Sequence, residues 1–436
     1  MKTHSGQYVV IVDGYSTGHE LVRELSSRGV TCLHLRSTAE IPSLVANCFD
    51  AGAYDKDLGY LGPVSEAAAG LAIVQPDAVV AGSEWGVTFA EFVAQDLGLP
   101  TNRIETISAR RNKFDMIKAV RAHGLYVADQ ASVGSPNEAH LWATLHGTWP
   151  VVVKPMLSAN SDGVVICHDH ADIDHAFAQA LYRENLLGCF NDRLVIQSYL
   201  AGPQFIVNTV SRGGRHCVTD AWYVAYRAVP GGSVAAESMT LLDPSLALSR
   251  VLFDYTLEAL SALGFENGAA HSELRMTRQG PALIETGACL MGGAMDPDSY
   301  RAAGLPTQAS RYADVLTLGV DQNDSAAGSR GYAFKRHLAK VFFVFSMAGE
   351  VRGTRGLSKL KMLSSFHAHY RALEKGARVW RTSDSLFCGG VVYLVHENRE
   401  QIHADIRQFR EWEAAGELYA VATATTTAKT EESLTS

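Results

Sequence analysis

The chain has 436 residues, which is too long for one hydrophobic core and predicts two to four domains. Its composition, 47% hydrophobic and 19% charged, is that of a soluble globular protein, and a net charge of −8 with scattered lysine and arginine argues against a nucleic-acid partner. The 7 cysteines include no C-x-x-C pair, so we expect a reducing compartment and neither a disulfide framework nor a zinc site.

The first residues of the chain predict neither export nor membrane insertion. The apolar run at residues 8–12 is too short for a signal peptide and is followed at once by Asp13 and Gly14. The most apolar later stretch, residues 341–348, is less than half as long as a membrane span. We therefore expect a cytoplasmic protein without a membrane partner.

Strands and helices alternate over the first hundred residues. Residues 8–12 and 31–35 have the continuous apolar pattern of buried parallel strands, and a helix is expected between them. A further strand at residues 78–81 leads into Gly82, Ser83 and Glu84. This is the pattern of a doubly wound α/β unit, in which ligands bind at the carboxyl ends of the strands, where Glu84 would lie.

The middle of the chain predicts an antiparallel α+β region that contains two notable lysines. A helix expected at residues 108–123 carries Lys113, and a strand at residues 151–153 ends at Lys154. A loop of small residues follows at 158–163, and such loops let backbone N–H groups approach phosphate. The other expected elements are strands near residue 127 and at 164–167, 194–200, 205–211 and 218–226, and helices at 137–146, 172–185 and 245–263.

Two glutamates lie on a predicted hairpin after these elements. Glu273 is in the segment HSELR and Glu285 in the segment LIETG, with a turn around Gly280 between them. Such a hairpin can aim both carboxylates at one point, where they can hold Mg²⁺ against the phosphates of a nucleotide. His271 precedes Glu273 on the same strand face, so it either meets a substrate or packs in the core.

The end of the chain predicts a small lobe and a tail. Strands are expected at residues 341–345 and 391–395, and helices follow each of them, the second at 399–414. From residue 422 the chain is rich in threonine and alanine, and we expect this tail to be disordered.

The order of these features resembles the ATP-grasp superfamily. The set comprises Lys113, Lys154, the small-residue loop, the strand before Gly202, and the two glutamates. The flanking segments narrow the resemblance to the L-amino-acid ligase group, which includes the dipeptide and dapdiamide synthetases; they read VVAGSEWGVTFAEFVAQDLGLPTNR, ARRNKFDMIKAVRAHGL, HSELRMTRQGPALIETGA and GEVRG…GARVWRTSDSLFCGGVVYLVHE. The resemblance extends from about residue 8 to 415.

The resemblance implies a fold of α/β plus α+β class, with a boundary for each part. A Rossmann-like domain with a doubly wound parallel sheet would comprise residues 1–107. An ATP-grasp core would comprise residues 108–330, with 127–205 as a mobile central lid lobe. A C-terminal α/β lobe would comprise residues 331–421, followed by the tail at 422–436.

The resemblance also implies a role for each candidate residue. Lys113 and Lys154 would bind the α- and β-phosphates of ATP as point charges, and Glu273 and Glu285 would hold Mg²⁺ or Mn²⁺. The remaining nucleotide contacts would come from Ser158, Ser161, Asp162 and Gly163 in the loop, from Gln197, Ser198, Tyr199 and Leu200 at the adenine, and from Gln204 at the ribose. The substrate contacts would come from Glu84, His271, Arg275 and Gly292, and the catalytic cations would be Lys154, Arg275 and Arg301.

Three positions depart from the pattern of the family. Relatives have an arginine four residues after the second metal glutamate, and this chain has Cys289 there. Either another arginine supplies that cation or the activity is weak or altered. Gln204 stands where a glutamate is usual, and Asn208 stands where an aspartate is common.

The main hypothesis is therefore an ATP-dependent carboxylate–amine ligase that joins amino acids, or an acyl amino acid and an amino acid, through an acyl phosphate. The alternative is an ATP-binding protein that has lost catalysis and acts as a sensor or scaffold, which the three departures would explain. A nicotinamide-dependent dehydrogenase is disfavoured because residues 13–18 lack the G-x-G-x-x-G spacing. The resemblance favours a homodimer.

Overall fold

The computed structural model describes residues 6–42, 45–46, 49–159, 161–229, 234–293, 295–318, 331–382 and 389–423. These residues form two compact units. The first contains the chain up to Ala225 together with Met239–Arg336, and the second contains Tyr226–Ser238 and the chain from His337 onward. In the described part of the chain, no helix has both the length and the apolar character needed to cross a membrane.

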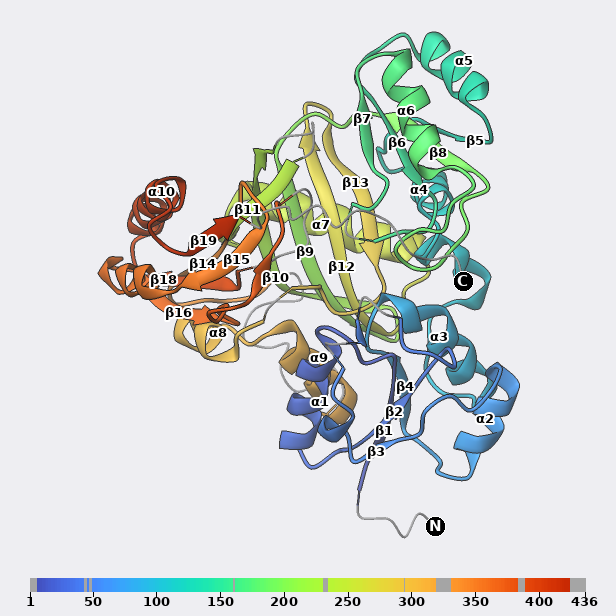
Figure 1. Cartoon of the computed structure of the whole chain (residues 1–436). Coiled ribbons are helices and arrows are strands. Elements are labelled where there is room, and N and C mark those ends of the chain that lie inside the picture. The colour runs from blue at the N-terminus through green and yellow to red at the C-terminus, as the bar shows by residue number, and fades with distance from the viewer. Residues whose placement is uncertain are drawn as a thin grey trace, which may run out of the picture. The chain divides into compact units, whose positions relative to one another are not determined.

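The chain begins with a parallel sheet of four strands in the order β3-β2-β1-β4 (Figure 1). Its elements are β1 (Tyr8–Val12), α1 (Gly18–Ser27), β2 (Thr31–Leu35), β3 (Lys56–Asp57), α2 (Val64–Ala72), β4 (Ala78–Ala81) and α3 (Val87–Asp96). Helices α2 and α3 pack on one face of this sheet and α1 packs on the other, which explains why its strands are apolar throughout. Glu84 begins a 3₁₀ turn, η3 (Glu84–Gly86), just beyond the carboxyl end of β4, as the sequence predicts.

The helix predicted from residue 108 is interrupted, and α4 (Lys113–Ala122) begins five residues later. Residues Ser108–Arg110 form a separate 3₁₀ turn, η5. The side chain of Asn112 accepts hydrogen bonds from the backbone N–H groups of Phe114 and Asp115, at 2.9 and 3.2 Å. Asparagine is a poor residue inside a helix and a good N-cap, so the chain starts a new helix here with Lys113 as its first residue.

A second sheet, of four antiparallel strands in the order β5-β8-β6-β7, is formed by residues from the middle of the first unit's sequence. Its elements are β5 (Gln130–Val133), α5 (Pro136–His146), β6 (Val151–Pro155), β7 (Val165–Cys167), α6 (His170–Ala180) and β8 (Leu194–Ser198). Helices α5 and α6 cover one face and complete a hydrophobic core with the strands (Figure 1). Strand β6 continues to Pro155, one residue beyond Lys154, where the sequence predicted its end, and α6 ends five residues before the predicted boundary at 185.

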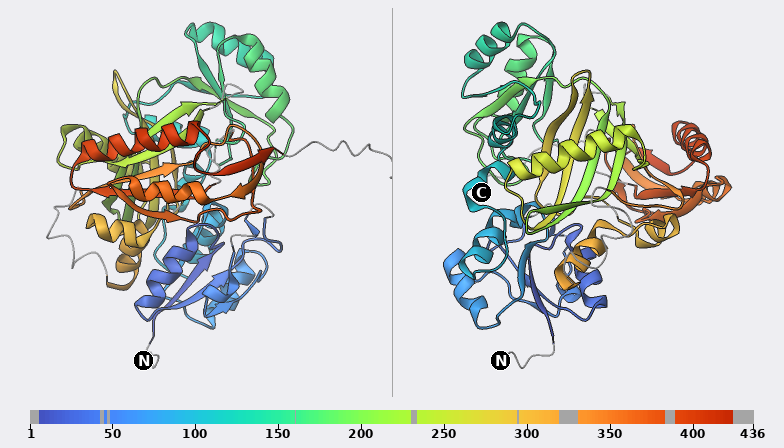
Figure 2. Two further views of the ribbon diagram at one scale, coloured as in Figure 1. Left: turned by 60° about the vertical axis from the view of Figure 1, so that its left-hand side comes forward. Right: turned by 180° about the vertical axis from the view of Figure 1, so that it is seen from behind.

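The third sheet of the first unit is antiparallel, with neighbouring strands in the order β13-β12-β9-β10. Its elements are β9 (Gln204–Arg212), β10 (Arg215–Ala228), β12 (Gly268–Thr277) and β13 (Gly280–Gly287), and the helices are α7 (Ala247–Ala262), α8 (Pro297–Ala303) and α9 (Gln308–Leu318). Strand β11 (Val234–Leu241), which the sequence did not predict, follows β10. Helix α7 crosses one face of the sheet (Figure 2). The predicted hairpin is confirmed as β12 and β13.

The second unit confirms the predicted strand at 391–395 and helix at 399–414 as β18 and α10, but short strands and a 3₁₀ segment replace the helix expected after residue 345. Its elements are β14 (His337–Phe342), β15 (Gly349–Gly353), the 3₁₀ segment η7 (Arg355–Met362), β16 (Phe366–Tyr370), β17 (Arg378–Val379), β18 (Val391–His396), α10 (Arg399–Ala414) and β19 (Ala420–Thr423). Strand β18 lies between β14 and β16, and β15 lies between β17 and β19. The predicted tail overlaps β19 at residues 422 and 423, and residues 424–436 lie outside the described part of the chain.

A buried arginine joins helix α3 to the third sheet's helix α7. Arg110 is fully buried, and its Nε and Nη2 donate to the Glu91 carboxylate at 2.9 and 2.5 Å. Its Nη1 donates to the carbonyl oxygen of Leu263, just after α7, at 2.8 Å. Asn102 donates a further hydrogen bond to Glu91 at 2.8 Å. The pair therefore holds two parts of the first unit together through charges that have little access to water.

Replacing Arg110 with methionine should leave the Glu91 carboxylate buried without its cation. We expect the free energy of unfolding to fall by about 3–5 kcal/mol, measured by urea denaturation. The matched control is Arg103→Met, which breaks an exposed ion pair with Glu266 and should cost less than about 1 kcal/mol. Equal losses in the two variants would contradict this account of Arg110.

Candidate active site

Two glutamates face each other on the hairpin of β12 and β13. Glu273 is the direct cross-strand partner of Glu285, and like charges in such positions destabilise a sheet. Burial, together with the nearby Glu285 carboxylate, raises the pKa of Glu273 to about 7. Burial would also raise the pKa of Glu285, but the Lys113 ammonium, with help from Lys154, holds it below its usual value. The pair thus combines one firmly ionised carboxylate with one that binds a proton easily.

Lys113 connects this hairpin to the segment that follows β6. Its Nζ lies 2.7 Å from Glu285 Oε2 and also donates to the carbonyl oxygen of Ser158, at 2.7 Å. Its backbone N–H donates to the carbonyl oxygen of Met156 at 2.9 Å. Because Lys113 is the first residue of α4, the capping by Asn112 fixes the point from which its side chain extends.

Lys154 lies within electrostatic reach of Lys113 and is almost completely buried, with 3% of its surface exposed. Burial and the neighbouring Lys113 ammonium lower the pKa of Lys154 to about 8, against the opposing effect of Glu285 and Glu273. Two ammonium groups that interact in a region of low dielectric constant favour the binding of an anion with several charges.

The loop after β6 is held in a turn by its own side chains. Asp162 accepts a hydrogen bond from the Ser158 hydroxyl at 2.7 Å and another from the backbone N–H of Leu186 at 2.8 Å. Ser161 and Gly163 have positive φ angles of 61° and 68°, which turn the backbone sharply. Asn160 lies outside the described residues. Asp162 therefore orders the loop, and the backbone N–H groups at Ser161 and Gly163 are the groups that could approach a phosphate.

The predicted adenine hinge consists of the last two residues of β8 and the two residues after it. The buried side-chain oxygen of Gln197 has no hydrogen-bond donor among the described residues, and Leu200 packs into a small apolar cluster with Ala282. The Arg275 guanidinium lies 6.0 Å from the centre of the Tyr199 ring and donates to the carbonyl oxygen of Gly202 at 2.8 Å. Arg275 thus supports the hinge from β12.

Two further predicted residues contact the glutamate pair or its strand. The side-chain amide of Gln204 donates to Glu273 Oε2 at 2.8 Å, so it holds this carboxylate. The His271 ring lies over Gly287, where an added Cβ atom would be 2.2 Å from the ring. Its Nδ1 is 3.2 Å from the carbonyl oxygen of Cys289, which can only accept, so Nδ1 carries the hydrogen. Burial lowers the pKa of His271, which leaves Nε2 as an acceptor.

Glu84 meets the cluster through an arginine that the sequence analysis did not single out. The Nη1 of Arg111 donates to Glu84 Oε1, and the other oxygen of Glu84 is 3.5 Å from the Sγ of Cys289. Burial raises the pKa of the Cys289 thiol to about 12, so it carries no charge. The only feature of the sequence that could have indicated a role for Arg111 is its position two residues before Lys113.

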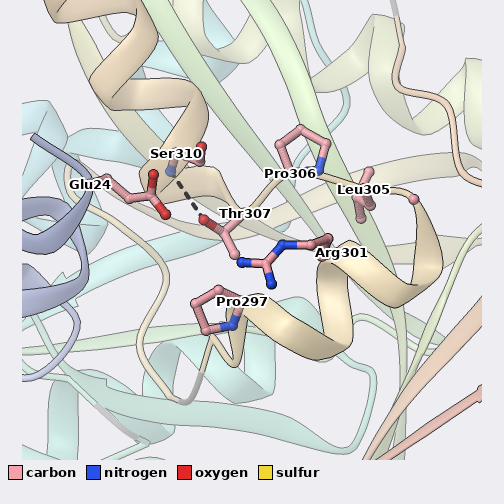
Figure 3. A pocket seen from close by; sticks show the side chains of 8 residues that line it. Glu24, Pro297, Arg301, Leu305, Pro306, Thr307 and Ser310 are labelled. Atoms are coloured by element: carbon pink, nitrogen blue, oxygen red, sulfur yellow. Dashed lines mark hydrogen bonds between the residues drawn. The ribbon is translucent and has the colours of Figure 1, made fainter. Parts of the chain in front are cut away.

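Two predicted residues are not brought to this cluster. Arg301 lies on α8 with 76% of its side chain exposed, and its ion pair is with Asp298, at 2.6 Å. It lines a surface pocket of about 270 Å³ that includes none of the residues of the glutamate cluster (Figure 3). Gly292 is exposed, and the space around its Cα is open. The structure thus gives neither residue a contact with the two glutamates or the two lysines.

A comparison with known proteins identifies the family. The chain is 30% identical over 412 residues to dapdiamide A synthase of Enterobacter agglomerans, and the match covers 94% of this chain and 96% of that protein. The chain belongs to the ATP-grasp carboxylate–amine ligases. No family model matches it.

Solved structures show the fold of these ligases. The L-amino acid ligase from Bacillus licheniformis has a TM-score of 0.71 at 17% identity, and the match covers 97% of this chain and 100% of that chain. The carboxyaminoimidazole ribonucleotide synthase from Aspergillus clavatus, solved in complex with ATP, has a TM-score of 0.68 at 14% identity and covers 94% and 99%. The predicted ATP-grasp fold is therefore confirmed.

In this ligase, ionisation of Glu273 should make the metal-free protein less stable as the pH rises. The pKa is raised from 4.5 to about 7, so the stabilising contribution of the protonated group is present below pH 4.5 and is lost as the pH rises through 7. Glu273→Gln mimics the protonated form at every pH. With EDTA at pH 8, we expect it to be more stable than the native protein by on the order of 2 kcal/mol.

The measurement is the thermal midpoint of each protein at pH 4 and pH 8. At pH 4 the native protein and Glu273→Gln should unfold at nearly the same temperature, because the carboxyl group is then mostly protonated in both the folded and the unfolded chain. The control Glu258→Gln, on the exposed face of α7, should show no gain at pH 8. A pH-independent difference between Glu273→Gln and the native protein would contradict the raised pKa.

Proposed function

We propose that this chain is an ADP-forming ligase that joins the carboxylate of one amino acid or acyl amino acid to the amine of a second amino acid. The observation that carries the proposal is the cluster of Glu273 and Glu285 with Lys113 and Lys154, because it combines ligands for a metal and for phosphates at one place. The name of the relative, dapdiamide A synthase, supports amide formation as the reaction.

The nucleotide would lie between the hinge and the two lysines. The unpaired acceptor of Gln197 suits the amino group of adenine, and the backbone around Tyr199 and Leu200 would provide the remaining contacts. The ammonium groups of Lys113 and Lys154 would bind the phosphates, and the backbone at Ser161 and Gly163 would close over them. Gln204 would act through Glu273 rather than at the ribose.

The two glutamates fit Mg²⁺, with Mn²⁺ as an alternative. Within the described residues no group of three or more His, Cys, Asp or Glu side chains forms a metal site. Mg²⁺ is commonly bound by one or two carboxylates together with substrate phosphates, so an opposed pair is the expected protein contribution. When bound, the ion neutralises charge on the β- and γ-phosphates during the transfer.

The reaction would proceed in two steps. An oxygen of the first substrate's carboxylate attacks the γ-phosphorus, and the bond to the bridging oxygen breaks with its electron pair remaining on ADP. The amine nitrogen of the second substrate then attacks the acyl carbon, and phosphate leaves with the electron pair of the C–O bond. The Nε2 of His271 is an acceptor suited to take the proton that the amine releases.

The proposal predicts ADP release that depends on a particular pair of amino acids. The assay incubates the enzyme with ATP and Mg²⁺ and tests the twenty amino acids singly and in pairs, with mass spectrometry of the product. Glu285→Gln removes a proposed metal ligand and should lower the rate by about 100-fold or more. Glu258→Gln is the matched control and should retain the native rate.

Three outcomes separate the candidate functions. Pair-dependent ADP release with an amide product supports the ligase and names its substrates. Phosphate release without an amide would contradict it. ATP binding without turnover would instead favour the sensor that Cys289, Gln204 and Asn208 suggest. The homodimer, the cytoplasmic location and the closing lid lobe at 127–205 stay predictions.

A further inference from the structure

Arg111 occupies a constrained position between three parts of the first unit. It ends the turn η5, and the next residue, Asn112, caps α4, so the backbone is held on both sides. Only 13% of its side chain is exposed. The guanidinium bonds to Glu84 at the edge of the parallel sheet and lies within electrostatic reach of Glu285 on the hairpin.

Most of the hydrogen-bonding capacity of Arg111 is not used by the protein. A guanidinium has five N–H donors, and in the described residues the Arg111 side chain donates to one acceptor, Glu84 Oε1. The side chains of Cys189 and Cys289 also lie within electrostatic reach of the guanidinium, and burial keeps the Cys289 thiol uncharged. A buried guanidinium with spare donors beside a cluster of metal and phosphate ligands suits a tetrahedral oxyanion.

The neighbouring arginines have roles that Arg111 does not share. Arg110 points away from the cluster and bonds to Glu91 and to backbone carbonyl oxygens. Arg275 bonds to the Gly202 carbonyl oxygen and lies against Tyr199. Arg301 is at the surface. Among the arginines just compared, only Arg111 combines proximity to Glu285 with a largely unused set of donors.

The side chain of Cys289 reaches the same place from the segment just after β13. Its thiol lies beside the carboxylate that Arg111 binds, although it comes from a position that follows Glu285 by four residues. A guanidinium extending from position 289 would enter the space next to Glu84 that the Arg111 guanidinium occupies. The small, neutral thiol leaves this space to Arg111.

We propose that Arg111 supplies the guanidinium that binds the phosphoryl group during its transfer to the substrate carboxylate, and that Cys289 leaves room for it. Glu84 is then a positioning residue that orients the guanidinium through one N–H. This inference rests on the proposed ligase function. In the transfer, the γ-phosphorus gains a bond to the substrate carboxylate oxygen and loses its bond to ADP, and Arg111 stabilises the equatorial oxygens without exchanging a proton.

The test moves the guanidinium from one position to the other. The variants are Arg111→Ala, Arg111→Lys and the double variant Arg111→Ala with Cys289→Arg, and Arg103→Ala is the surface control. We expect Arg111→Ala to lower kcat for ADP release by about 100-fold or more with little change in ADP affinity. The double variant should recover at least about tenfold of that loss, because a guanidinium again reaches the phosphoryl group.

A binding measurement tests the role without turnover. Calorimetry measures the affinity of inorganic phosphate for the enzyme loaded with ADP and Mg²⁺. Arg111→Ala should weaken phosphate binding by about tenfold, Arg111→Lys should weaken it less, and the double variant should restore it. Arg111→Lys keeps the ion pair with Glu84 and so covers the case in which Arg111→Ala does not fold.

Two results would overturn the proposal. One is equal phosphate affinity in the native protein and Arg111→Ala. The other is full recovery of activity and phosphate affinity in Arg111→Ala combined with Glu84→Gln, since Arg111 would then serve only to neutralise Glu84. If the native protein binds ADP and phosphate but no amino-acid pair releases ADP, the ligase function fails while the phosphate comparison still decides the role of Arg111. Absence of ADP binding would overturn both proposals.

Discussion

The repulsion between Glu273 and Glu285 is the constraint around which the centre of the first unit is arranged. The hairpin places the two carboxylates opposite each other, and the compensating groups come from three other elements. Lys113 extends from the start of α4, Lys154 from β6, and the amide of Gln204 from β9. A site that binds a divalent cation needs this concentration of negative charge, and the protein offsets it with groups that can also bind phosphate. The same charges therefore stabilise the free protein and prepare it for a nucleotide.

Local sequence accounts for the part of this arrangement that could be predicted. The short turn identifies the hairpin, so Glu273 and Glu285 could be placed on neighbouring strands from the sequence alone. The register set by the turn would pair Glu273 with Ile284, and a shift in register between Glu273 and Leu274, which the sequence did not predict, makes Glu285 the partner. The apolar strand of valines before Lys154 identified β6 in the same way. By contrast, the bond between Gln204 and Glu273 depends on the pairing of β9 with β12, which joins residues far apart in the chain. No local pattern specifies that pairing.

The remaining differences have equally specific causes. The sequence pattern predicts one helix through residues 108–123. The Asn112 side chain instead bonds to backbone N–H groups as an N-cap, so a new helix starts at Lys113. Because α4 begins only at Lys113, Arg111 lies just before the helix, where its side chain bonds to Glu84. No local sequence pattern predicts this contact, so Arg111 was not among the predicted site residues. Arg301 was predicted to be a catalytic cation because of its charge. It lies with Asp298 on the exposed face of α8, and this placement could not be predicted from its charge. In the second unit, residues 355–362 form a 3₁₀ segment between short strands in place of the first expected helix, while the second expected helix is present as α10.

The order of strands in the second sheet has a consequence for how such a chain can be built. Strands β5 and β8 are neighbours, and Asp129 and Ser198 are joined by hydrogen bonds of 2.8 and 2.9 Å, so the chain enters and leaves this sheet at one place. The residues of its hydrophobic core all come from the segment 131–196. A segment with its own core and adjoining ends has the topology of an inserted domain. Replacing it as a single block would leave the order of the strands that carry the two glutamates unchanged.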